Sequence, residues 1–180
     1  MKNTHINKQC HALSQASGLS VRLFYKEEIL DAHGQFLLNP DPMTLYKDLL
    51  LSKKHLASVH TSELFEFYAQ VKINEDYSII LGPTNALVMD QEKINRMLSR
   101  LQIKDPLRND YIAKWEASPN LSVERLAWIL VFLANSLSKT KLDIDEVYID
   151  IKEETSTLLS KNLSQMDDSF VETDLIGNFH

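Results

Sequence analysis

The sequence Leu64-Phe65-Glu66-Phe67-Tyr68-Ala69-Gln70-Val71-Lys72-Ile73 is followed by Asn74-Glu75-Asp76 and then by Tyr77-Ser78-Ile79-Ile80-Leu81. In the first stretch, apolar residues alternate with a set of mostly polar residues that includes Glu66, Gln70 and Lys72. This period of two residues is typical of a half-buried strand. The polar triplet predicts a turn, and the last stretch predicts a more continuously apolar strand. We expect a β-hairpin that ends at Gly82-Pro83, because proline has no amide to donate to a sheet.

Further elements are expected on the N-terminal side of this hairpin. The order is a helix over residues 6–16 that stops at Ser17-Gly18, a strand over 19–25, a hairpin of 28–30 and 35–38 around the turn 31–34, and a helix over 43–52. Together with the hairpin above, these elements predict an α+β fold. We expect a small antiparallel sheet of at least four strands with helices on one side.

After Gly82-Pro83 the pattern is mostly helical. Asp90 is expected to cap a helix, Asp105-Pro106 and Ser118-Pro119-Asn120 are expected to interrupt the helical region, and Ser122 is expected to open a strongly apolar helix. A more polar amphipathic segment spans residues 144–163. We therefore divide the chain into a sensor-like domain at 1–88, a helical bundle or linker at 89–166, and a tail or linker at 167–180.

Composition narrows the class of protein. The 180 residues carry a net charge of -6, which argues against direct binding of a phosphate backbone. A single cysteine, Cys10, excludes an intramolecular disulfide framework. The N-terminus leads into no apolar signal segment, and the apolar run 127–134 is far shorter than the ~20 residues needed to span a bilayer. We expect a cytoplasmic protein with no membrane contact.

No pattern of catalytic or metal-binding residues stands out. The histidines are scattered, Cys10 and His11 are adjacent rather than brought together by spacing, and the glycines are too far apart for a phosphate-binding loop. The acidic clusters lie in polar segments typical of solvated faces. We therefore expect no enzyme activity, no metal and no cofactor.

Aromatic residues on the predicted strands, with one charged strand residue, could line a pocket for a small molecule. The candidate ligand-binding residues are Arg22, Phe36, Phe65, Phe67, Tyr68 and Tyr77. The alternative is that the aromatic side chains fill the core, which is the commoner role of large apolar residues.

Trp128 and Phe132 lie one helical turn apart on the helix that Ser122 opens, and we expect them to form a dimer interface. The alternative is that both are core residues. Residues 120–127 resemble the opening of a helix-turn-helix unit, but the apolar and acidic residues that follow do not supply a basic recognition helix. We therefore expect no DNA contact by this helix.

The order of helix, hairpin, helix and hairpin over residues 13–83, ending in Ile80-Leu81-Gly82-Pro83, is similar to that of PAS/GAF-type sensor domains. With the helices after it, the chain resembles the regulatory half of AraC/XylS-type transcription regulators of Gram-positive bacteria. The resemblance implies a sensing and dimerisation domain, with a small-molecule effector and a homodimer. DNA would be bound only by a C-terminal helix-turn-helix domain that this chain does not contain.

Two other functions stay open from the residues alone. One is a small cytoplasmic enzyme of unrecognised type that uses Arg22, Tyr68, His33 or His60 as pocket chemistry. The other is a structural adaptor, which would dimerise without responding to a ligand.

Overall fold

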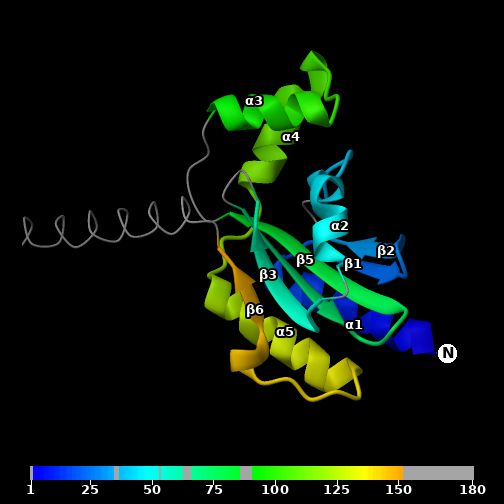
Figure 1. The fold of residues 1–180 in the computed structure, drawn as a ribbon. Helices are drawn as coiled ribbons and strands as arrows, with labels where there is room; N and C mark the ends of the chain where they lie inside the picture. The colour runs from blue at the N-terminus through cyan, green and yellow to red at the C-terminus, as the bar shows by residue number, and fades with distance from the viewer. Residues whose placement is uncertain (1, 35–36, 53, 63–65, 86–90, 152–180) are drawn as a thin grey trace, which may run out of the picture. The chain divides into compact units, whose positions relative to one another are not determined.

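The computed structural model describes residues 2–34, 37–52, 54–62, 66–85 and 91–151. Residues Met1–Asp150 form one compact unit, built in its described part from a six-stranded sheet and five α-helices (Figure 1). This confirms the α+β class. The division expected between residues 88 and 89 falls among residues outside the described ranges and stays a prediction. Among the helices described, none is long and apolar enough to cross a membrane.

The strands are arranged in the order β2-β1-β5-β4-β3-β6, and all neighbours are antiparallel except β3 and β6, which are parallel. In chain order the elements are α1 (Lys2–Ser17), β1 (Val21–Tyr25), β2 (Glu28–His33), the 3-10 helix η1 (Pro42–Tyr46), α2 (Lys47–Leu50), β3 (Ala57–Thr61), β4 (Glu66–Lys72), β5 (Tyr77–Asn85), α3 (Gln91–Arg100), α4 (Asp105–Glu116), α5 (Val123–Leu137), the 3-10 helix η2 (Ile144–Glu146) and β6 (Tyr148–Asp150).

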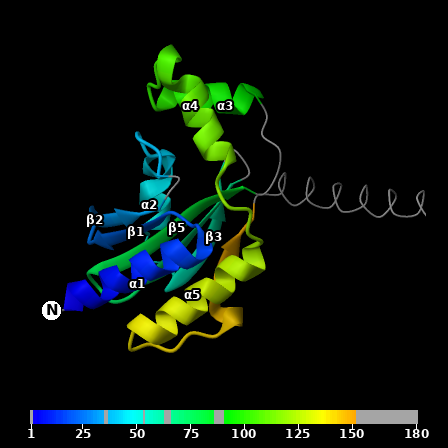
Figure 2. The same cartoon turned by 180° about the vertical axis from the view of Figure 1, so that it is seen from behind.

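One face of the sheet is predominantly apolar. Leu23 pairs with Ile79, Ile79 with Val71, and Val71 with Ala57, so these side chains share a face across the four central strands. All four are fully buried. Helices α1 and α5 lie on this face, α1 against β1 and β2 and α5 against β3 and β4 (Figure 2).

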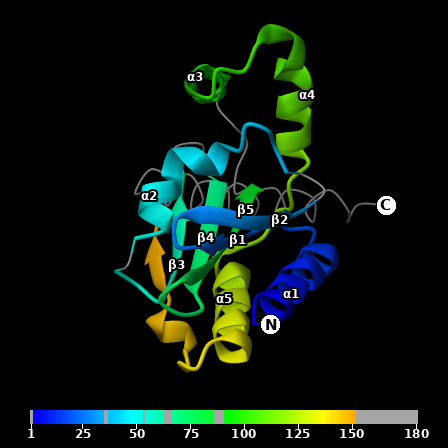
Figure 3. The ribbon, with the colours of Figure 1, turned by 90° about the vertical axis from the view of Figure 1, so that its right-hand side faces the viewer.

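The opposite face is also covered, but it carries polar residues. Arg22 pairs with Ile80, Ile80 with Gln70, and Gln70 with Ser58, which places them in one row across the sheet. The segment η1–α2 covers this face (Figure 3). It contributes Met43 and Leu50 to a buried cluster with three sheet residues, namely Phe24, Tyr68 and Ile80.

Two expectations are therefore wrong. Helices cover both faces of the sheet rather than one, and β4 is buried on both faces rather than half-buried. Glu66, Tyr68 and Gln70, which the alternation assigns to a solvent face, each have only 1% of their surface exposed. The period of two identifies the two faces of a strand but does not show what later segments place over them.

The first hairpin is not where the sequence predicts it. Strand β2 includes residues 31–33 of the expected turn 31–34, and the chain reverses earlier, at Lys26-Glu27 between β1 and β2. Lys26 adopts a positive φ of 56° there. Glycine is the residue that most easily takes such a conformation, so Gly34 was the more obvious turn residue, but the pairing of β1 with β2 overrides this preference.

Strand β5 continues through Gly82-Pro83 to Asn85, whereas the sequence predicts an end at Leu81. The pairing of β4 with β5 shifts register between Phe67 and Ala69, so two residues of β5, Gly82 and Pro83, lie opposite the single residue Tyr68 of β4. The Gly82 amide donates instead to the Ser20 carbonyl at 2.9 Å. Because residues in a bulge take no part in the regular pairing, Pro83 can lie in β5 although it has no amide to donate.

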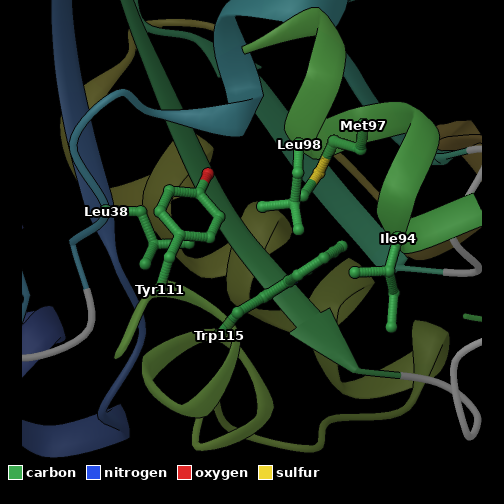
Figure 4. Close-up of a cluster of buried hydrophobic side chains, with 6 residues drawn as sticks. All are labelled: Leu38, Ile94, Met97, Leu98, Tyr111 and Trp115. Carbon is green, nitrogen blue, oxygen red and sulfur yellow. The ribbon is translucent and has the colours of Figure 1, made fainter. Parts of the chain in front are cut away.

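Helices α3 and α4, here called the helical arm, form a hydrophobic cluster of their own (Figure 4). Its buried members are Leu38, Ile94, Met97, Leu98, Tyr111 and Trp115. The break expected at Asp105-Pro106 is the start of α4, because proline lies in the first turn, where its missing amide costs nothing. Asp90, the expected cap of α3, lies outside the described residues.

The C-terminal part of the unit contains one expected helix and one unexpected strand. Helix α5 begins as predicted, with the Ser122 hydroxyl accepting from the Arg125 amide at 3.3 Å. The amphipathic segment expected from residue 144 onward instead forms η2 and then β6, which pairs with β3. Residues 152–163 of that segment lie outside the described ranges.

Replacement of Gly82 with alanine is expected to destabilise the fold by about 2 kcal/mol, within the range for strained backbone positions. Gly82 has a φ of +116°, and an added Cβ would lie 2.7 Å from the Phe67 carbonyl oxygen. Gly18→Ala is the comparison, because its φ is +72° and the nearest atom, Pro119 Cγ, would be 3.3 Å away. Urea denaturation should show the larger loss for Gly82→Ala, and equal losses would contradict this account of the bulge.

Candidate functional site

The most unusual feature of the polar face is the buried guanidinium of Arg22 on β1. Only 1% of its side chain is exposed, and it forms a two-point ion pair with the Asp41 carboxylate, with Nη2 2.9 Å from Oδ1. Its Nη1 donates to the Gly82 carbonyl at 2.6 Å. The charge is therefore both neutralised and hydrogen-bonded, as a buried charge must be.

Asp41 also caps the 3-10 helix η1. The same oxygen, Oδ1, accepts from the Met43 amide at 3.0 Å. The ion pair therefore fixes the start of the segment that covers the polar face, and the Tyr111 hydroxyl of α4 donates to the neighbouring Pro40 carbonyl at 3.0 Å.

Glu66, at the start of β4, is a second buried carboxyl group close to this pair. It accepts hydrogen bonds from the Trp115 indole of α4 and from the Ser62 hydroxyl, the latter at 3.1 Å. Burial raises the pKa of Glu66 to about 8, an effect that the hydrogen bond from Ser62 and the charge of Arg22 only partly offset. Glu66 therefore connects the sheet to the helical arm, and its burial favours the neutral carboxylic acid.

Several buried polar atoms of this region have no hydrogen-bond partner among the described residues. They include the Tyr68 hydroxyl and the Gln70 side-chain nitrogen, both on β4 and on the face that η1–α2 covers. Folded proteins leave few such groups unpaired, because each costs about 1–3 kcal/mol. Groups of this kind are suited to hydrogen-bond a small molecule or an ordered water.

The structure brings together some of the candidate ligand-binding residues. Arg22 and Tyr68 lie on the polar face, whereas Phe67, the neighbour of Tyr68 on β4, lies on the opposite face; all three have at most 2% of their surface exposed. Tyr77 lies at the other end of β5, where its ring is 5.2 Å from that of Tyr25, away from the Arg22 pair. Phe36 and Phe65 lie outside the described residues. The binding role of the whole set stays a prediction.

Ser58 and His60 of β3 and Asp150 of β6 lie in a row. Their order matches the serine, histidine and aspartate of a hydrolase triad. The Ser58 hydroxyl is 3.0 Å from His60 Nε2, and His60 Nδ1 is 3.4 Å from Asp150 Oδ2. A triad exposes its serine to the substrate and buries its aspartate. Here Ser58 is 3% exposed and the Asp150 side chain is 47% exposed, so the gradient is reversed. The row serves better as a tie between the two strands than as a catalytic relay.

The other histidine considered for pocket chemistry, His33, lies on β2 and interacts with α1. Its Nε2 is 2.6 Å from the Asn7 side-chain oxygen, and Asn7 in turn donates to Asp31 at 2.5 Å. His33 is thus far along the chain and the sheet from Tyr68. Among the described residues no group of three or more His, Cys, Asp or Glu side chains is placed to hold a metal ion.

A surface hollow of about 1080 Å³ lies at the turns that join β1 to β2 and β4 to β5. Its lining mixes both signs of charge, with Lys26 and Lys72 beside Glu28, Glu75 and Asp76. None of the buried cluster of Arg22, Glu66 and Tyr68 lines it. We regard the buried cluster as the better candidate site, because its polar groups converge away from solvent, whereas those of the hollow are solvated.

Trp128 and Phe132 are exposed on the outer side of α5, by 53% and 59%. They are therefore not core residues, which removes one of the two readings that the sequence left open. Whether they form an interface stays a prediction.

Sequence reasoning missed three members of the cluster. The strand pattern assigns Glu66 to a solvent-facing side, and no local motif singles out Asp41 or Trp115. They lie at distant positions in the chain, so no local spacing links them. The one available signal was the charged Arg22 in an otherwise apolar strand, which requires a buried partner.

The sequence matches no protein-family model and no curated protein sequence. Function is therefore inferred from the chain's own residues and contacts.

Replacement of Arg22 with methionine is expected to destabilise the fold by about 3–5 kcal/mol, the usual cost of breaking a buried pair. Asp41 and the Gly82 carbonyl would both lose their donor. Arg125→Met, at an exposed position on α5, is the control and should change stability by no more than about 0.5 kcal/mol. Urea unfolding at pH 7 checks both. Equal small effects would show that Arg22 does not hold the polar face together.

Proposed function

We propose that the chain is the regulatory domain of a transcription regulator of the AraC/XylS type, and that it senses a small molecule on the polar face of a PAS/GAF-like sheet. The observation that carries this proposal is the cluster of Arg22, Asp41, Glu66 and Tyr68, in which the buried Tyr68 hydroxyl, like the side-chain nitrogen of Gln70 on the same strand, has no hydrogen-bond partner among the described residues. The order of α1, the β1–β2 hairpin, η1–α2 and the remaining antiparallel strands supports the PAS/GAF-like part of the proposal.

The mechanism follows from what the cluster touches. Asp41 caps η1, Gly82 belongs to the bulge of β5, and Glu66 accepts from Trp115 of the helical arm. A molecule that hydrogen-bonds Tyr68 or Gln70 would favour one arrangement of these segments over another, by as much as its affinities for the two differ. The helical arm or α5 would pass the change to an attached helix-turn-helix domain.

Dimerisation belongs to the same proposal. Trp128 and Phe132 present two large rings on one side of α5, and aromatic residues of this kind are enriched at protein interfaces. A two-fold axis crossing α5 between them would bring Trp128 of one copy against Phe132 of the other, and would do so twice. Such an interface would set the spacing of two DNA-binding domains.

The ligand part is tested by thermal unfolding in the presence of a panel of metabolites, with the variants Tyr68→Phe and Tyr25→Phe. A ligand at 100 times its Kd should stabilise the native chain by about 2.7 kcal/mol. Tyr68→Phe should remove that gain and should itself stabilise the free protein by about 1 kcal/mol, because it removes an unpaired buried hydroxyl. Tyr25→Phe, at the far end of β1, should retain the ligand response. No response to any metabolite would count against sensing.

The dimer part is tested by the double variant Trp128→Glu and Phe132→Glu. We expect the native chain to be a dimer by sedimentation equilibrium and the double variant to be a folded monomer with an unchanged circular dichroism spectrum. Leu107→Glu, at a residue of α4 that is 63% exposed, should remain dimeric. A native chain that stays monomeric at high concentration would refute dimerisation through this face.

A further inference from the structure

Two carboxyl groups and one guanidinium share the polar core. Asp41 holds the ion pair with Arg22, and Arg22 also donates to the carbonyl of Gly82, which lies against Tyr68, two residues from Glu66 on the same face of β4. One positive charge compensates one negative charge, so ionisation of both carboxyl groups would leave a net negative charge away from water. The cluster is therefore most stable with one carboxyl group ionised and the other protonated.

The two carboxyl groups differ in what they hold and in their access to water. Asp41 is 16% exposed and caps η1, so it can return to solvent if Arg22 leaves it. Glu66 is 1% exposed and has no such route. If Glu66 loses its proton to solvent, the guanidinium is the cation available to it within the described cluster.

We propose that Glu66 and Asp41 compete for Arg22, and that loss of the Glu66 proton moves the guanidinium toward Glu66 and releases Asp41 together with the start of η1–α2. This inference rests on the proposed function, since it names a proton as a signal read at the same site. The bond from Arg22 Nη1 to the Gly82 carbonyl would keep the guanidinium on the sheet during the exchange.

The groups that face Glu66 come from four parts of the fold. They are Arg22 on β1, Asp41 before η1, Ser62 and Tyr68 on or beside β4, and Tyr111 and Trp115 on α4. Burial holds the pKa values of Tyr68 and Tyr111 above the ordinary range, so neither ionises before Glu66. The pKa of Glu66, about 8, places its titration where cellular pH can change its charge.

Trp115 provides a direct reporter of this ionisation. The chain has two tryptophans, so Trp128→Phe leaves Trp115 as the only one and keeps an aromatic ring on α5. In this background, fluorescence between pH 6 and 9.5 should follow a one-proton curve with a midpoint near 8. Glu66→Gln should flatten the curve, whereas Glu116→Gln, at an exposed carboxylate next to the reporter, should leave it unchanged.

The variant Asp41→Asn tests the competition itself. It removes the rival carboxylate, so Arg22 becomes fully available to Glu66, and the midpoint should fall by at least one pH unit. A midpoint that stays near 8 would show that the two groups do not share Arg22. A flat curve in the Trp128→Phe background would overturn the inference while leaving the ligand and dimer tests above untouched.

Movement of η1–α2 is measured by amide hydrogen exchange of residues 42–50. The native chain and Glu66→Gln are compared at the same pH, so that the effect of pH on the intrinsic exchange rate is the same for both. The ratio of their exchange rates should be near one at pH 6 and should rise several-fold at pH 9. A fluorescence titration with an unchanged exchange ratio would mean that Glu66 ionises without releasing the segment, and it would overturn the proposal.

Discussion

The guanidinium of Arg22 is the constraint around which the polar half of the structure is arranged. A strand residue that is 1% exposed and positively charged needs a carboxylate and further acceptors within reach, or the strand would not be buried at all. Asp41 and the Gly82 carbonyl supply them from two different parts of the chain. The covering segment η1–α2, the bulge in β4–β5 and the position of β1 are thereby tied to one another.

Burial on this face is unlike burial on the opposite one. Leu23, Ile79 and Val71 pack beneath α1 and α5 without any polar side-chain atom to satisfy, so their burial depends on complementary shape. On the polar face, each buried polar group requires a hydrogen-bond or ion-pair partner at a defined position. It is also where the helical arm is joined to the sheet, through the bond from Trp115 to Glu66 and that from Tyr111 to the Pro40 carbonyl.

The contrast explains which features could be predicted from the sequence. The period-two pattern identified the strands β1, β4 and the start of β5, and the Ser122 cap identified the start of α5, because these signals are local. The cover of Glu66 and Gln70 could not be predicted, since it comes from η1–α2 and α4, which are far away in the sequence. The β1–β2 turn at Lys26 was missed for the opposite reason, because its local signal was weaker than that of Gly34.

A buried ion pair beside a buried carboxylic acid is not the most stabilising arrangement for a sheet. Apolar residues of similar volume often do as well or better, so such clusters contribute little net stability relative to an apolar core. Local sequence patterns and tertiary burial disagree most strongly at Glu66, Tyr68 and Gln70, and disagreements of this kind are expected at functional sites. The same residues adjoin the segment η1–α2 and helix α4, so a change in their hydrogen bonding would reach these two segments rather than the apolar core. We therefore propose that any binding function of this domain lies on the polar face of the sheet, while the opposite face supplies much of the apolar core.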